Sequence, residues 1–170
     1  MKSIQELMGM ALVTVQEGIR LGTLKGVEFN AGDDAIRYLH FDGAGKRADG
    51  VVAWSSVRSV GKDAITVDSE TSVQETIPVV ERETVGPDVR SRPVLTEGGT
   101  HVGKVTGYEV DEVAGRIERY HVATGGLLGR LTHSEVVFGR SSIRAFGRDA
   151  IVIADDVLTS GAAQPTEAAT

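Results

Sequence analysis

The chain carries the same short segment twice, and this repetition restricts its fold more than any other feature. Residues 55–67 read SSVRSVGKDAITV, and residues 141–153 read SSIRAFGRDAIVI, 86 positions further along. An earlier pair of blocks, residues 18–26 and 99–107, repeats at an offset of 81. Because the blocks keep their order in both copies, the sequence predicts two complete structural units and not one scrambled duplication.

The offset grows from 81 to 86, so the second copy holds five extra residues between about 122 and 140. Several glycines fall there, which predicts a lengthened hairpin loop. The loop lacks the strand-to-helix setting and the Lys-Ser/Thr ending of a phosphate-binding loop, so that function is disfavoured. Its apolar tip, Leu127 and Leu128, is a candidate contact for a protein partner, with a plain hairpin loop as the alternative.

Within each copy, short β-prone segments alternate with turns that contain glycine or aspartate. We predict strands at 13–15, 21–27, 36–41 and 64–67 in the first copy and at 94–96, 101–105, 117–122 and 150–153 in the second. Glycines inside strands, such as Gly22 and Gly103, indicate bulges or close backbone approach. A small barrel needs such bends to close, so the expected fold class is all-β.

Helix is scarce in this pattern. Ser3 and Glu6 fit a capping box ahead of apolar residues, which predicts one N-terminal helical turn. The paired serines Ser55-Ser56 and Ser141-Ser142 are candidate caps of one further short turn in each copy.

The predicted organisation is a first barrel at 1–70, a linker at 71–88, a second barrel at 89–157 and a disordered tail at 158–170. Ile77–Val80 within the linker is a candidate strand that docks on one barrel. We expect each half to supply its own apolar interior, although units of this size lie near the lower limit for independent stability.

The composition excludes several classes of protein. The absence of cysteine rules out disulfides, thiolate catalysis and cysteine-ligated zinc. A net charge of −6 opposes general nucleic-acid binding, which remains open only through a local basic patch. Neither a signal peptide nor a membrane span is evident, so we expect a cytoplasmic protein. The excess of arginine over lysine is typical of a GC-rich bacterial genome.

The ordered set of paired blocks resembles the PRC-barrel domain family. The pattern opens with Leu21-Gly22 or Val102-Gly103, continues through an Asp-containing turn before an isoleucine strand, and closes with the Ser-Ser and Gly-Lys/Arg-Asp-Ala-Ile segments. The resemblance covers about residues 8–68 and 89–155, and it implies a small six-stranded barrel for each copy.

That family includes the cytoplasmic portion of the photosynthetic reaction-centre H subunit and the C-terminal domain of a ribosome-maturation factor. The resemblance does not imply that the barrel is a catalyst. The chain lacks the membrane helix of the first protein and the separate N-terminal domain of the second, which argues against either role.

Two histidines, His40 and His121, occupy equivalent strand positions and are expected to point away from the interior. They form either a ligand-binding or pH-sensing pair or, as we favour, two surface histidines inherited by duplication. His101 and His133 have no ligand-like spacing, so no metal site is expected.

Basic residues also repeat, and the pairs Arg58 with Lys62 and Arg144 with Arg148 are candidate phosphate, RNA or partner contacts. The simpler interpretation is charge pairing with the adjacent Asp63 and Asp149. Trp54 has no aromatic equivalent in the second copy, where Arg140 stands, and it is expected in the core or at an interface.

The sequence therefore predicts a non-enzymatic protein-interaction or assembly module of two PRC-type barrels, without a cofactor. A protein partner or self-association is expected because small domains often need docking to be stable. The alternatives are an RNA- or ribosome-associated maturation factor and a small-ligand binder with its site in the cleft between the barrels.

Overall fold

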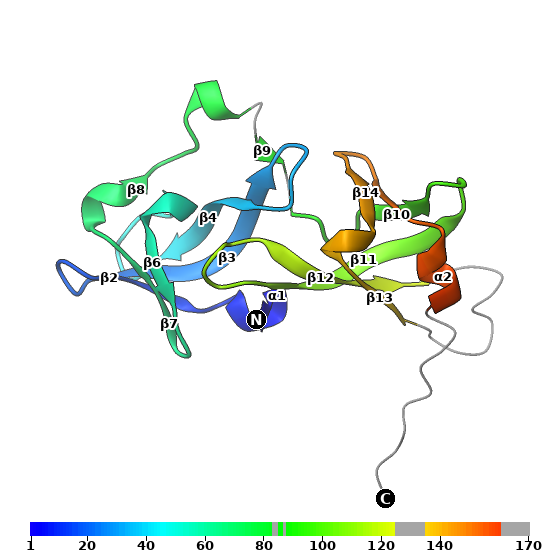
Figure 1. Cartoon of the computed structure of the whole chain (residues 1–170). Coiled ribbons are helices and arrows are strands. Elements are labelled where there is room, and N and C mark those ends of the chain that lie inside the picture. The colour runs from blue at the N-terminus through cyan, green and yellow to red at the C-terminus, as the bar shows by residue number, and fades with distance from the viewer. Residues whose placement is uncertain (83–84, 87, 125–134, 161–170) are drawn as a thin grey trace, which may run out of the picture.

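The computed structural model describes residues 1–82, 85–86, 88–124 and 135–160. The first repeat forms one sheet and the second repeat forms another, and the two sheets lie next to each other (Figure 1). The strands of the first sheet are β2 (Ala11–Thr14), β3 (Arg20–Asn30), β4 (Ile36–Gly43), β5 (Gly50–Ala53), β6 (Val57–Val60), β7 (Ala64–Val67) and β8 (Val73–Gln74). Those of the second are β10 (Pro93–Thr96), β11 (His101–Val110), β12 (Ile117–Ala123), β13 (Glu135–Gly139), β14 (Ile143–Phe146) and β15 (Ile151–Ile153).

The two sheets share one strand order. In the first it runs β6-β7-β2-β3-β4-β5, and in the second β14-β15-β10-β11-β12-β13, with equivalent strands at equivalent places. The first strand of each set pairs in parallel with the last, β2 with β7 and β10 with β15. On its other side the first strand is antiparallel to its neighbour, β2 to β3 and β10 to β11. The predictions of an all-β fold and of six strands for each copy are confirmed.

The glycines of the Leu-Gly and Val-Gly pairs lie where two backbones approach closely. A Cβ added at Gly22 would lie 1.8 Å from the carbonyl oxygen of Asp42, and one added at Gly103 would lie 2.0 Å from that of Ala123. Further along the same strands the register shifts, between Leu24 and Gly26 in β3 and at the equivalent place in β11. The predicted close approach and bulging are therefore present in both copies.

Replacing Gly22 by alanine is expected to lower the free energy of unfolding by about 2 kcal/mol, because the new methyl group must push two paired strands apart. Gly26→Ala is the matched control, since its added Cβ would meet only His40 Cβ, at an ordinary 3.9 Å. Urea denaturation of both variants measures the difference. Equal losses of stability would show that the close approach at Gly22 is not what requires glycine.

Short helical turns connect the strands. The capping box forms as predicted: Ser3 N donates to Glu6 Oε2 (2.7 Å), Glu6 N donates to Ser3 Oγ (3.2 Å), and helix α1 (Ile4–Leu7) follows. The paired serines are not caps, because the turns already begin one residue earlier and take no side-chain cap. These 3₁₀ turns are Trp54–Ser56 and Arg140–Ser142, and two more lie at Glu70–Ser72 and Val79–Glu81.

The segment predicted as a linker is part of the fold. Residues 73–74 form β8 on the edge of the first sheet, and Val85–Gly86 form the short strand β9. The candidate strand at Ile77–Val80 is not formed, because a 3₁₀ turn begins at Val79.

The prediction of a disordered tail from residue 158 is wrong at its start. Helix α2 spans Asp156–Ser160 and includes the buried Val157. The rest of the predicted tail and the loop tip at Leu127 and Leu128 lie outside the described residues.

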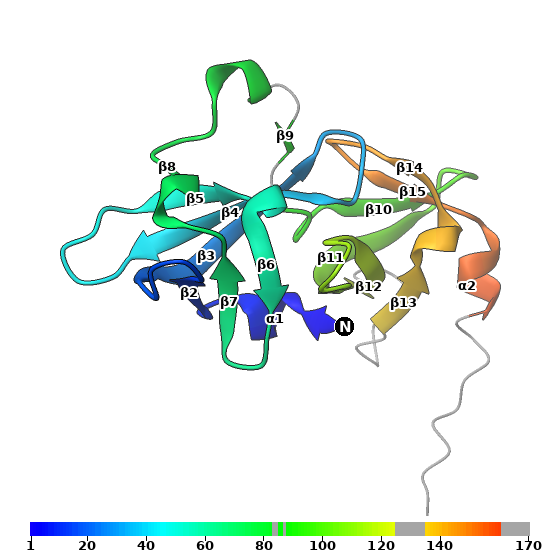
Figure 2. The ribbon, with the colours of Figure 1, turned by 60° about the vertical axis from the view of Figure 1, so that its left-hand side comes forward.

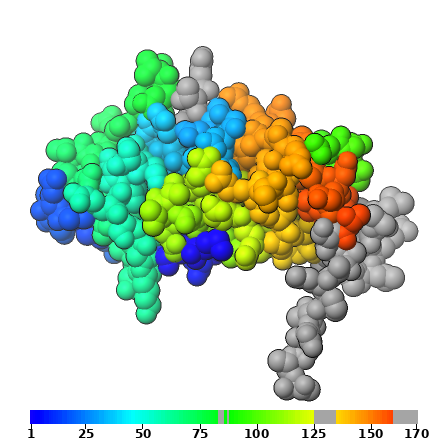
Figure 3. Space-filling view, in the orientation of Figure 1, coloured from blue at the N-terminus to red at the C-terminus, as the bar shows by residue number. Residues whose placement is uncertain are grey.

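The prediction of two separate apolar interiors is wrong. Buried side chains of both sheets form one connected cluster, in which Phe29 of β3 meets Tyr108 of β11 edge to face, with ring centroids 5.6 Å apart. Figure 3 shows the hairpin between β11 and β12 lying directly against the first repeat. A unit the size of one repeat buries only about 60% of its unfolded surface when it folds alone, and the shared core increases the apolar burial of both repeats.

Candidate functional site

The two repeats meet through equivalent hairpin turns, one between β3 and β4 and the other between β11 and β12. Ala35 and Arg116, which are 81 positions apart, form an antiparallel bridge. On either side of it, Ile36 N donates to Gly115 O (2.8 Å) and Ile117 N donates to Asp34 O (3.1 Å). The same pair of contacts is made in both directions, so a local two-fold axis passes through this bridge, as in a symmetric homodimer.

The repeats also exchange their first strands. Strand β1 (Lys2–Ser3) leaves the first repeat and pairs with β11 of the second, with Lys2 opposite Val110. Strand β9, just before the second repeat, pairs with β3 of the first, with Gly86 opposite Phe29. Val110 and Phe29 are themselves equivalent residues. The exchange is therefore reciprocal, as in domain-swapped dimers.

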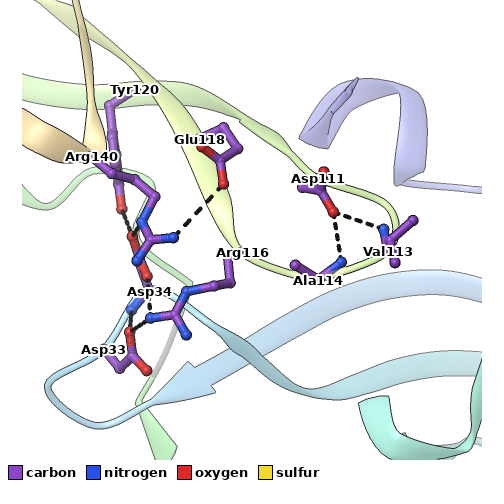
Figure 4. A network of polar contacts seen from close by, with 9 residues as sticks. All are labelled: Asp33, Asp34, Asp111, Val113, Ala114, Arg116, Glu118, Tyr120 and Arg140. Atoms are coloured by element: carbon purple, nitrogen blue, oxygen red, sulfur yellow. Dashed lines mark hydrogen bonds and ion pairs between the residues drawn. The ribbon is translucent and has the colours of Figure 1, made fainter.

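Charge at the interface is divided between the repeats (Figure 4). Asp34 from the first repeat is almost fully buried and lies 2.9 Å from Arg140 Nε and 3.2 Å from an Arg116 terminal nitrogen. The neighbouring Asp33 contacts Arg116 at 2.5 Å. Both acids come from one repeat and both bases from the other, so these ion pairs favour contact between unlike repeats over contact between like ones.

Burial sets the protonation chemistry of this cluster. It raises the pKa of the Asp34 carboxyl, as does hydrogen bonding with Asp33, against the lowering effect of Arg140 and Arg116. Burial likewise raises the pKa of Tyr120, so its hydroxyl stays protonated and donates to Asp34 Oδ2 at 3.3 Å. The Tyr120 ring stacks on Phe138, with centroids 5.2 Å apart, which ties the cluster to the core. The arrangement is that of a structural ion-pair network.

The opposite side of the two-fold axis carries a contact of different chemistry. Trp54 and Arg140 occupy equivalent positions, and so do Gly115 and Asp34. Gly115 has φ +66°, and a Cβ added there would lie 2.4 Å from Trp54 Cε2, so the indole lies directly on the glycine. The two symmetry-related contacts therefore differ in chemistry. At one of them Arg140 pairs with Asp34, and at the other Trp54 packs on Gly115. Trp54 therefore packs between the two repeats, and its contact with a protein partner stays a prediction.

Each repeat also has an open pocket beside its histidine. His40 Nε2 lies 3.3 Å from Glu28 Oε1, and His121 Nε2 lies 3.6 Å from Glu109 Oε2, so the same His–Glu pair occurs twice. The first pocket has a volume of about 470 Å³, and the second, of about 340 Å³, is lined partly by the N-terminal residues Ser3 and Gln5. Both histidines are half-exposed, as their place in the strand predicts.

Within the described ranges, no group of three or more His, Cys, Asp or Glu side chains is arranged to hold a metal ion. The same part of the chain contains no helix long and apolar enough to cross a membrane.

The predicted basic pairs do not bond to the adjacent aspartates. Arg58 pairs with Asp68 across the β6–β7 ladder, and Arg144 lies 3.5 Å from Glu97. These partners follow from strand pairing, which brings residues far apart in sequence opposite each other. Lys62 lies in the exposed β6–β7 turn, whereas Arg148 lines a small crevice beside the turn of the first repeat.

Sequence reasoning missed Asp33, Asp34 and Arg116 as interface residues. The available signal was a break in the repeat, because acids, a glycine and a lone arginine stand where the other copy has unlike residues. Such mismatches mark positions at which two initially identical surfaces have specialised.

A family model of the PRC-barrel domain matches the chain twice, at residues 1–74 and 85–158. No curated protein matches it. The two matched ranges begin at or next to the exchanged strands β1 and β9, so each domain as the family defines it includes the strand that it lends to its neighbour.

Proposed function

The chain belongs to the PRC-barrel domain family, and from that premise we propose that it is a non-enzymatic assembly module which binds a protein partner in the cytoplasm. The observation that supports this proposal most directly is the interface between the repeats. Exchanged strands, a shared core and unlike charges hold two barrels in one fixed arrangement. A fixed pair of related surfaces suits the positioning of partners.

The polar groups at the centre of the molecule serve this arrangement. Arg116 and Arg140 both pair with Asp34, and the burial of Asp34 favours a structural role for this carboxylate over contact with a substrate. The outer sheet edges and outer faces are then the surfaces left for partners, and strand edges pair readily with extended segments of other chains.

The test is chemical cross-linking in the native cell, with the tagged chain as bait and quantitative mass spectrometry as the readout. We expect one or a few proteins to be enriched over the tag alone, and the enrichment to survive treatment with ribonuclease. Recovery of ribosomal proteins that disappear after ribonuclease would contradict the proposal and support the RNA-associated alternative. Absence of any enriched protein would also contradict it.

A further inference from the structure

The first repeat shows how an extended segment docks on this fold. Strand β8 pairs with the outer edge of β5, with Val73 opposite Val52 and Gln74 opposite Val51. Three residues after β8, Ile77 packs on Tyr38 and Val51 in a small cluster of its own. Figure 2 shows β8 beside β5 and the chain arching upward from β8 to a short helical turn. We call residues 73–82 the strap.

A polar contact fastens the far end of the strap. The Tyr38 hydroxyl and the Arg37 guanidinium both donate to Glu81 Oε2, the latter at 3.0 Å. The strap therefore holds the sheet at three points: the strand edge, the apolar spot under Ile77 and the carboxylate of Glu81.

The equivalent surface of the second repeat is open in the part of the chain that the structure describes. There β13, the counterpart of β5, pairs with β12 alone. Val137, the counterpart of Val51, is 44% exposed, against 2% for Val51. Where the first repeat turns at Glu70–Ser72 into β8, the second continues as helix α2. Within the described residues the strand edge thus lacks a strap, and so does Val137, although Arg119, paired with Glu109, stands where the first repeat has Tyr38.

Residues 159–170 of the chain are poorly suited to fill this place. The strap depends on the β-branched apolar side chains of Val73 and Ile77, spaced four residues apart. Residues 159–170 read TSGAAQPTEAAT and contain no apolar side chain larger than alanine or proline. A segment of this composition offers little apolar area to cover Val137.

We propose that β13 and Val137 form a docking site for an extended segment of a partner protein, which adds a strand to the sheet edge. This inference rests on the proposed function and names its surface. The recognised segment carries two β-branched apolar residues four apart, as Val73 and Ile77 are, the first at the strand edge and the second over Val137. Backbone hydrogen bonds to β13 supply part of the affinity, and the two side chains supply the selectivity.

The strap itself provides the probe. A labelled peptide of residues 70–82 is titrated into the full-length chain and followed by fluorescence anisotropy. We expect saturable binding, weakened about tenfold or more by Val137→Lys, which places a charge where the apolar side chain docks. A peptide in which the residues corresponding to Val73 and Ile77 are serine is expected to bind as weakly. Val113→Lys is the matched control, because this valine is 92% exposed at the tip of the β11–β12 hairpin, and it should leave binding unchanged.

Several outcomes would overturn the inference. They are no binding of the peptide, equal binding to wild type and Val137→Lys, or binding only after the chain is truncated at Ser160, which would make the tail the occupant. A sedimentation equilibrium showing a dimer that Val137→Lys dissociates would instead assign the edge to a second copy of the chain.

Cross-linking with the Val137→Lys bait separates this inference from the proposed function. Partners captured equally by wild type and variant would leave the assembly role standing and remove β13 as its site. Capture of no partner by the wild type would remove the assembly role itself.

Discussion

Replacing Asp34 by arginine is expected to lower the free energy of unfolding by about 3–5 kcal/mol, the cost of breaking a buried ion pair and leaving like charges together. The side chain of Asp34 is only 7% exposed, and it faces Arg140 at 2.9 Å and Arg116 at 3.2 Å. The variant places three guanidinium groups around one buried point and removes the acceptor of the Tyr120 hydroxyl. Guanidinium denaturation at fixed pH measures the change.

Two further variants test the cause. Asp63→Arg makes the same change of charge in the exposed β6–β7 turn and is expected to stay within about 0.5 kcal/mol of wild type. Combining Asp34→Arg with Arg140→Asp restores one pair of opposite charges and should recover part of the lost stability, because Arg116 still faces the new arginine. If the double variant is no more stable than Asp34→Arg alone, the pairing with Arg140 is not what holds the interface.

Replacing Gly115 by valine is expected to lower the free energy of unfolding by about 2–5 kcal/mol. A β-branched residue at φ +66° carries about 1–2 kcal/mol of backbone strain, and the added side chain would begin 2.4 Å from the Trp54 indole, which adds about 1–3 kcal/mol of overpacking. Thermal and urea unfolding of the variant check the size of the loss.

The control for Gly115→Val is Gly99→Val, because Gly99 has φ +85° but no atom within 4 Å of its added Cβ. It should cost only the backbone strain. Adding Trp54→Ala to Gly115→Val removes the overlapping ring. Trp54→Ala should therefore destabilise the Gly115→Val variant less than it destabilises the wild-type chain. Additive losses would mean that Trp54 and Gly115 do not interact.

Together these contacts favour pairing of the two unlike repeats over pairing of like repeats. At an interface between two first repeats, Trp54 would meet Asp34 in place of glycine, and four aspartates would gather near the axis. Between two second repeats, the arginines would gather there instead. A symmetric contact with opposite charges on its two sides penalises both like pairings.

Much of the local structure could be predicted from the sequence. The alternation of apolar residues with glycine-bounded turns located eight strands, since this period depends on near neighbours alone. The Ser3–Glu6 capping box and the bends at Gly22 and Gly103 were predicted for the same reason. The serine caps were wrong because the turns begin one residue earlier, at Trp54 and Arg140.

The candidate site could be predicted only in part. Trp54 drew attention because its counterpart is arginine, and the interface does contain both. The partners of Arg58 and Arg144 could not be found, because Asp68 and Glu97 come near only when strands pair. The strap at 73–82 resembled a linker, since its burial depends on a sheet edge built by residues earlier in the chain.

The sequence by itself determined that one β-rich unit occurs twice, where four strands of each unit lie and which glycines its bends require, because each of these follows from residues close together in the chain. Tertiary structure alone decided that the units exchange their first strands, share one core and divide acids from bases across a two-fold axis. The two-residue strands β1 and β9 carry almost no pattern of their own. Their partners are strands of the other repeat, and these come within reach only once the two repeats meet through Phe29 on Tyr108 and Asp34 beside two arginines.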